Sequence, residues 1–496
     1  MGVECPVNAW LVFLSASLVG TLLTVLLAVL VLWRTGRRWI DLVADRTLDI
    51  LVTDPYRHNL WEFISASRRS GVQLLIENSM RAATGEVIKR PMGSPKPSPQ
   101  FDAIGFTPAQ VTRAASAGVI DLSVAIGPGA QRPLHLAIPI LIGGMGYGVG
   151  ITRQAWSALL GGATAMGTVV NTGEGVVYLE DVDAAGGRFI LQWSRAHWAK
   201  EPQLVRACSA VEIHFGQGAS TGLGIHIPPE ELKEARSAMK LGPREWARIG
   251  EQFPGVHGVR DVSRMVTFLR EMSNGVPIGA KIAPGDDIEA CLEALLECGV
   301  DFITIDGAQA GTKGSEPIAE DDFGLPTFFA LSRARRYFDA HRVKDVSLII
   351  SGGLATPGHF LKAIALGATA VAIGSPALYA ASHGQLQKAL PFEPPTELVL
   401  MVGKRTDRFD PLEGARSLAL FLKSCADEMA MGIRAMGKMS IREVSASDLF
   451  ALDPEVARTA GIRYAGEARW DLYRKDRTRR RDNVWSQKSS GWRERS

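Results

Sequence analysis

The segment VSLIISGGLATPGHFLKAIALGATAVAIGSPAL, from Val346 to Leu378, decides the fold. Two apolar strand patterns, VSLIIS and TAVAIG, end in Gly352-Gly353 and in Gly374-Ser375, with a helical pattern between them. Glycine lets backbone amides approach an anion closely, and the N-terminus of a following helix adds the positive end of its dipole. In (β/α)8 barrels a phosphate is bound in this way after strands 7 and 8. The segment therefore predicts a phosphate cradle, with a pair of ordinary strand-ending turns as the alternative.

Short apolar runs bounded by glycine recur upstream and alternate with helical patterns such as Asp286 to Glu297. The runs are continuously apolar, which is typical of strands covered on both faces of a parallel sheet. The runs are His135 to Gly143, Ala165 to Val170, Arg188 to Trp193, Val211 to Phe215, Val276 to Ile282, Val300 to Ile305, Val346 to Ile350 and Thr369 to Ile373. They span about 240 residues, close to the usual size of a TIM barrel. We predict an α/β fold with a closed (β/α)8 TIM barrel; a doubly wound open sheet is the alternative.

The barrel leaves long segments on both sides, which predict an N-terminal transmembrane helix and helical extensions. Lys89 to Pro99, KRPMGSPKPSP, is rich in proline, which blocks helix and stiffens a connector. The predicted regions are a transmembrane anchor at 7–33, a helical juxtamembrane region with the proline-rich linker at 34–130, the barrel at 131–390, a C-terminal helical extension at 391–470 and a basic disordered tail at 471–496.

Residues 5 to 33 contain no charged side chain, so this stretch is long enough to cross a bilayer. Glu4 precedes the run, whereas Arg34, Arg37 and Arg38 follow it, which does not fit a cleaved signal peptide. By the positive-inside tendency we predict a single-pass membrane protein with the barrel on the cytoplasmic side.

Charge and cysteine content exclude several classes of function. The net charge is +3, and the last 26 residues alone carry nine Lys or Arg against four Asp or Glu. The folded part is therefore nearly neutral, which argues against a nucleic-acid partner. The tail is most simply solvated, with anionic lipid as an alternative partner. The five cysteines are scattered, so we predict neither a disulfide framework nor a metal site.

Several further segments carry a resemblance to a known family. They are KRPMGSPKPSPQFD from Lys89, PILIGGMGYG from Pro139, VVNTGEG from Val169, QGASTG from Gln217 and IDGAQAGT from Ile305. Together with the cradle segment they resemble the FMN-binding domain of glutamate synthase, in particular its shorter relatives, over roughly residues 89 to 380. NTGEG in this order among the others is specific, whereas a lone glycine pair would not be.

The resemblance implies FMN across the C-terminal mouth of the barrel. Gly352, Gly353, Gly374 and Ser375 would hold its phosphate, and Met145 and Gly146 would lie against its ring. The Lys281 ammonium would stabilise the anionic reduced ring, since charge that develops on reduction is favoured by a nearby cation. A surface lysine at a strand end is the alternative.

The resemblance also implies roles for two residues of NTGEG. Glu174 would orient ammonium and take protons as a keto acid becomes an imine and then an amine, and Asn171 would fix the loop. Taken alone, an acid in such a loop is as often a cap or turn residue.

The chain departs from the family around the loop after strand four. Glutamate synthases read IKIAQGAKPGEGGQ, whereas this chain reads IHFGQGASTGLGIH, so Gln217 keeps register. His214 and Ser220 stand in place of two lysines, and His226 in place of a glutamine. A neutral serine cannot pair with a carboxylate as a cation does, which leaves the substrate open between 2-oxoglutarate and another keto acid. Both histidines fit a substrate role or an ordinary core or loop role.

A second departure is that no compact cysteine trio follows Leu378, so no iron-sulfur cluster is expected. The sequence also predicts no glutaminase cysteine at the anchor end and no Rossmann fingerprint. Three hypotheses follow: a membrane-anchored FMN oxidoreductase of glutamate synthase-like chemistry, a phosphate-binding barrel without redox activity such as an isomerase or lyase, and an inactive scaffold. In the oxidoreductase hypothesis, ammonia and electrons come from other proteins. A membrane partner and a second copy of the chain are the further partners that this hypothesis allows.

Overall fold

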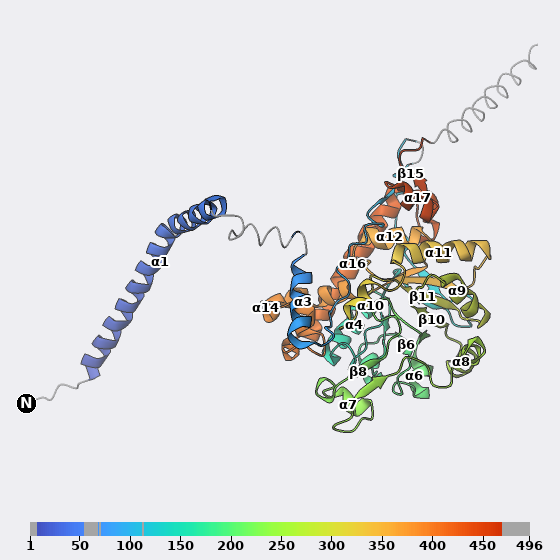
Figure 1. Ribbon diagram of the computed structural model, residues 1–496, viewed down its shortest axis with the longest axis horizontal. Helices are drawn as coiled ribbons and strands as arrows, with labels where there is room; N and C mark the ends of the chain where they lie inside the picture. Colours follow the sequence, from blue (N-terminus) through green and yellow to red (C-terminus); the bar gives the residue numbers. More distant parts are fainter. Residues whose placement is uncertain (1–6, 54–67, 69–70, 112–113, 469–496) are drawn as a thin grey trace, which may run out of the picture. The chain divides into compact units, whose positions relative to one another are not determined.

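A computed structural model describes residues 7–53, 68, 71–111 and 114–468. The chain divides into two compact units, Met1–Ile88 and Lys89–Ser496. The first contains helices α1 (Val7–Thr53) and α3 (Val72–Thr84), drawn in blue in Figure 1. One part of α1, Ser17–Thr53, is long and apolar enough to cross a membrane by length and composition. The predicted tail at 471–496 and part of the predicted helical juxtamembrane region at 34–130 lie outside the described residues.

Eight parallel strands of the second unit close into a barrel, so the prediction of a TIM barrel is confirmed and the open sheet is wrong. Each strand is buried along most or all of its length, because helices cover the outside and side chains fill the inside. The strands are β4 (Ile140–Ile142), β5 (Val170–Asn171), β6 (Phe189–Trp193), β7 (Ala210–His214), β10 (Ile278–Ile282), β11 (Phe302–Asp306), β12 (Ser347–Ser351) and β13 (Ala370–Ile373).

Two of the predicted runs differ from the observed strands. The run from His135 to Gly143 contains β4 but also most of β3 (Leu134–Leu136), which pairs with β2 (Val124–Ile126) in an antiparallel hairpin. Pro139 separates the two, because proline has no amide to continue a ladder. The hairpin shares an apolar cluster with residues of the barrel strands and so covers one end of the barrel. The run from Ala165 begins at the end of a helix, and only Val170 onward is strand.

Helices follow the barrel strands and cover the sheet, as α8, α9 and α11 do around the yellow-green side of Figure 1. Their apolar faces repeat at helical spacing, which buries one side of each against the strands. The helices are α4 (Arg153–Ala165), α5 (Leu179–Ala184), α6 (Pro202–Ala207), α8 (Val259–Met272), α9 (Ile288–Glu297), α10 (Pro317–Asp321), α11 (Thr327–Ala340), α12 (Pro357–Ala365) and α13 (Ser375–Ser382).

The C-terminal segment packs onto the barrel mainly through the long helix α16 (Pro411–Ala435). It lies against α4 so closely that a Cβ on Gly162 would come 2.8 Å from the Leu418 side chain. Strand β1 (Ile104–Phe106), just after the proline-rich segment, pairs with β14 (Leu449–Ala451) and ties the two ends of this unit together. The remaining elements are α7 (Ala235–Ala238), α14 (Leu386–Ala389), α15 (Pro394–Leu398), α17 (Pro454–Ala460), β8 (Ile225–Ile227), β9 (Ala247–Ile249) and β15 (Arg463–Tyr464).

Candidate active site

A cavity of about 1420 Å³ opens at the carboxyl ends of the barrel strands. Loops after β4, β5, β7, β11, β12 and β13 contribute to its wall, which is where active sites of this architecture lie. Residues of the proline-rich segment, Pro91 to Ser98, also line it. The sequence predicted only a stiff connector there. Hydrogen bonds from Met92 N to Thr312 O and from Arg90 N to Ser315 O, both 2.9 Å, hold this segment against the loop after β11.

The two predicted glycine ends lie side by side on the cavity wall, because β12 and β13 are neighbours in the barrel. Gly352 has φ 111°, a conformation that other residues rarely adopt, and a Cβ there would come 2.6 Å from Thr327 Oγ1. Around Gly374 a Cβ would meet nothing within 4 Å. Ser375 then begins α13, so the N-terminus of a helix adjoins the open space beside Gly374. The arrangement fits an anion.

The loops of GGMGYG and NTGEG cross with their backbones in contact. A Cβ on Gly146 would lie 2.4 Å from the amide nitrogen of Gly175, and a Cβ on Gly175 would lie 2.4 Å from that of Tyr147. Only glycine permits this approach. The crossing places Met145 and Glu174, both on the cavity wall, on adjacent loops.

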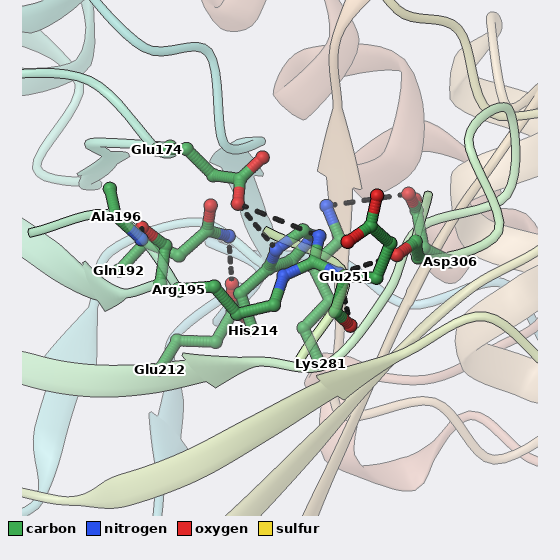
Figure 2. A network of polar contacts seen from close by, with 12 residues as sticks. Glu174, Gln192, Arg195, Ala196, Glu212, His214, Glu251, Lys281 and Asp306 are labelled. Atoms are coloured by element: carbon green, nitrogen blue, oxygen red, sulfur yellow. Dashed lines mark hydrogen bonds and ion pairs between the residues drawn. The ribbon is translucent and has the colours of Figure 1, made fainter. Parts of the chain in front are cut away.

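The Glu174 carboxylate is buried beside the side chains of His214 and Arg195 (Figure 2). Its Oε1 lies 3.2 Å from His214 Nδ1 and 3.8 Å from Arg195 Nη2. Burial acts to raise the pKa of Glu174, but His214, Arg195 and Lys281 outweigh it and hold the pKa below its ordinary value. The indole of Trp198 donates to the Glu174 carbonyl oxygen at 2.8 Å and fixes the backbone. The site therefore presents a carboxylate, not a carboxylic acid, to the cavity.

The Lys281 side chain is buried at the end of β10, with its Nζ 3.3 Å from Asp306 Oδ2 (Figure 2). Burial acts to lower the pKa of Lys281, but the carboxylates of Asp306, Glu212 and Glu174 raise it above its ordinary value. Asp306 also accepts hydrogen bonds from the hydroxyl of Ser351 and from the amide of Gly218. Lys281 is therefore a fixed ammonium and not a mobile surface lysine.

Glu212, which the sequence did not single out, connects the inner side chains of the site. Its Oε1 accepts from Asn171 Nδ2 at 2.7 Å and from Gln192 Nε2 at 2.8 Å, and its Oε2 accepts from Thr304 Oγ1 at 2.6 Å. Asn171 Oδ1 in turn accepts from Gly173 N at 3.0 Å, so this amide holds the NTGEG loop. The one available signal was a carboxylate within the otherwise apolar strand AVEIH, from Ala210 to His214.

The sequence of this chain is similar to known proteins over most of its length. Residues 114–438 match the conserved region in glutamate synthase. The chain belongs to the glutamate synthase family. It is 30% identical over 418 residues to a glutamate synthase large subunit-like protein of Rhizobium meliloti (strain 1021), covering 79% of this chain and 93% of that protein. It is 27% identical over 429 residues to an archaeal-type glutamate synthase (NADPH) of Thermotoga neapolitana, covering 79% and 83%. A solved flavocytochrome b2 variant with sulfite bound has a TM-score of 0.47 and 16% identity, over 88% of this chain and 95% of that one.

In this glutamate synthase family chain, the four residues predicted to contact the substrate lie in two different settings. Gln217, Ser220 and His226 line the cavity. His214 does not belong to the lining residues; it lies behind Glu174, and its Nε2 is buried without a partner among the described residues. Ser220 presents a small neutral hydroxyl to this wall.

Proposed function

We propose that the protein is a membrane-anchored, FMN-dependent oxidoreductase with glutamate synthase-like chemistry. The reaction is the reductive amination of 2-oxoglutarate or a related keto acid through an imine, or its reverse, which is chemistry on a CH–NH2 group. Ammonia and electrons are supplied by other proteins. The observation that carries the proposal is that the Glu174 carboxylate, the Lys281 ammonium and the glycine cradle all line one cavity.

FMN fits the residues of this cavity. Its phosphate would be held by Gly352, Gly353, Gly374 and Ser375, where the open space at Gly374 leaves room for an anion. Lys281 would lie toward the ring, as would Met145 and Gly146 on the crossing loops. The chemistry that FMN supplies when bound is the transfer of a hydride to or from a carbon centre.

In this proposal, side chains of the protein bind the nitrogen of the substrate and serve as proton donors and acceptors. A carboxylate such as Glu174 pairs with ammonium and with the protonated imine, so it orients nitrogen toward the keto carbon. His214 and Arg195 keep Glu174 ionised, and we assign His214 a positioning role through Glu174. Gln217, Ser220 and His226 supply polar contacts to the keto acid. Asn171 maintains the loop that carries Glu174.

The membrane part of the proposal is supported by the apolar part of α1. The three arginines after residue 33 favour a cytoplasmic barrel by the positive-inside tendency. An anchored enzyme without a nicotinamide fingerprint in its sequence would exchange electrons with a protein or apolar carrier at the membrane.

The flavin content of the full chain, purified in detergent, tests the proposal. We expect near-stoichiometric FMN, identified by mass after denaturation, which bleaches on anaerobic addition of glutamate or another amino acid if the reverse reaction occurs. Lys281→Met should weaken FMN retention or alter its reduction, whereas Lys423→Met on α16 should not. If the protein takes up no flavin even after incubation with FMN, the proposal fails and a phosphate-binding barrel without redox activity takes its place.

A further inference from the structure

The wall of the large cavity divides into a charged part and an uncharged part. Among the described residues that line it, every Lys, Asp and Glu falls between Lys89 and Glu316, and no Arg belongs to the lining. From Ser351 to Ser424 the lining is uncharged, apart from His383, whose imidazole can gain a positive charge. This part, the uncharged wall, begins at the glycine cradle and continues along α13. It therefore suits a different kind of ligand from the charged part.

Two helices that pack against each other, α13 and α16, supply much of the uncharged wall beyond the cradle. Tyr379 on α13 and His383 just after it lie four residues apart, which places them on one helix face. The lining residues of α16 also recur at the spacing of one helix face. They are Ser417, Leu420, Phe421 and Ser424. Leu400 and Val402, from the loop before α16, complete this wall.

Large apolar side chains on the uncharged wall remain open to solvent. Tyr379, Val402 and Leu420 line the cavity and are exposed. Phe392, also exposed, is next in sequence to Glu393, which accepts a hydrogen bond from the Tyr379 hydroxyl. Exposed apolar groups that gather at a cavity mark a binding site rather than an ordinary solvated surface.

The cavity is also larger than one ligand requires. Pockets for a single small molecule usually measure about 300–1,000 Å³. This cavity measures about 1420 Å³. FMN and an amino or keto acid would occupy the cradle and the charged part, which leaves the uncharged wall beyond the cradle for a third molecule.

The chemistry of the uncharged wall favours an uncharged ring compound with an apolar tail. A fatty acid would need a cation for its carboxylate, and among the described residues this wall offers none that is permanently charged. Tyr379 and Phe421 are aromatic side chains on which a ring can pack. The hydroxyls of Ser417 and Ser424 and the imidazole of His383 can donate hydrogen bonds to carbonyl oxygens. A quinone combines these features, and quinones dissolve in a bilayer, which the apolar part of α1 is long enough to cross.

We propose that the uncharged wall binds a quinone-class carrier from the membrane, which exchanges electrons with the amino or keto acid through bound FMN. This rests on the proposed function and names its electron partner. In the oxidising direction, CH–NH2 and quinone give C=NH and quinol. Two electrons and two protons leave the C–H and N–H bonds of the amine, and both carbonyl oxygens of the quinone become hydroxyls. Reductive amination runs the same exchange in reverse.

Photolabelling of the full chain in detergent tests this, with a ubiquinone analogue that carries an azide on its ring as the probe. We expect label, located by mass spectrometry, on peptides of α13 and α16, and we expect excess decylubiquinone to suppress it. Leu420→Glu should lower this labelling by about tenfold or more, because the new carboxylate must lose water to face an apolar ligand.

Met431→Glu is the matched control. Leu420 and Met431 both lie on α16 and are 58% and 63% exposed, but Met431 does not line the cavity. Labelling of Met431→Glu should therefore equal that of wild type. Ser424→Glu, at a second exposed position on the uncharged wall, should lower labelling as Leu420→Glu does.

Two results would overturn the inference. One is label that spreads over α1 and the protein surface and is not suppressed by decylubiquinone, as partition into the micelle alone would give. The other is equal labelling of Leu420→Glu and Met431→Glu. FMN content, measured on the same samples, decides the proposed function separately. A chain that holds FMN but shows no suppressible label on the uncharged wall would keep the proposed function and lose this inference. Suppressible label there without FMN would keep the quinone site and refute the redox proposal.

Discussion

Replacing Glu212 with alanine should be among the most damaging single changes in the barrel, although Glu212 touches no proposed substrate. Glu212 is 2% exposed, and its carboxylate accepts hydrogen bonds from Asn171, Gln192 and Thr304. Alanine removes all three acceptor contacts and leaves the three donors in the barrel interior. It also removes one of the carboxylates that raise the pKa of Lys281.

The size of the effect follows from these contacts. An unsatisfied buried donor costs about 1–3 kcal/mol, so three donors give roughly 3–9 kcal/mol, and water from the cavity that reaches them brings the cost toward the lower end. Glu212→Gln keeps the volume and keeps Oε1 as acceptor for the two amides. The Thr304 hydroxyl can rotate and accept a hydrogen bond from the new amide. We therefore expect the free energy of unfolding to fall by only about 1 kcal/mol. Comparing Glu212→Ala with Glu212→Gln therefore separates the effect of the lost hydrogen bonds from the effect of the lost charge.

The assay is urea-induced unfolding of the full chain in detergent, followed by tryptophan fluorescence. Glu271→Ala, at an exposed position on α8, is the control and should change stability by less than about 0.5 kcal/mol. The reasoning is refuted if Glu212→Ala lies within about 1 kcal/mol of wild type, or if Glu212→Gln destabilises as much as Glu212→Ala.

Four further predictions concern the site and the anchor. Glu174→Gln should keep the fold and the bound FMN but lower turnover by about 10²–10⁴-fold, the usual range for a positioned acid–base group. Undiminished turnover would show that Glu174 takes no part in the proton transfer. Because the folded-state pKa of Glu174 is lowered, its ionisation stabilises the fold above the pKa of an unfolded glutamate, and that stability is lost as pH falls through the folded value. Wild type should therefore lose more stability than Glu174→Gln between neutral and strongly acidic pH, as measured by thermal unfolding; parallel profiles would contradict this. Gly146→Ala should destabilise the protein because its Cβ would lie 2.4 Å from a backbone nitrogen, whereas Gly374→Ala, whose Cβ meets open space, should fold normally and bind FMN more weakly. Deletion of residues 7–33 should move the protein from the membrane to the soluble fraction, and a deletion variant that still sediments with membranes would contradict the anchor.

Local pattern was enough to predict the barrel strands and the glycine ends that follow β12 and β13. The strand from Val346 to Ile350 overlaps β12 (Ser347–Ser351), and the run at Thr369 contains β13, because buried parallel strands leave continuous apolar runs. The strand boundaries were predicted wrongly where one apolar run included parts of two strands, as on either side of Pro139. Glu174 stood in the NTGEG motif and Lys281 at the end of a predicted strand, whereas Glu212 and Arg195 had no motif of their own.

The sequence by itself determined the order of strands and helices, the glycines that let two loops cross, and the long apolar N-terminal segment. Each of these depends on residues close together in the chain, through periodicity or through the φ values open to glycine. Only the tertiary structure decided which charges meet. His214 lies 40 residues from Glu174 in sequence, and Lys313 lies 82 from Glu231. Closing a parallel barrel brings the carboxyl end of every strand to one mouth, so side chains from distant segments share one cavity, and their pKa values and partners follow from that closure.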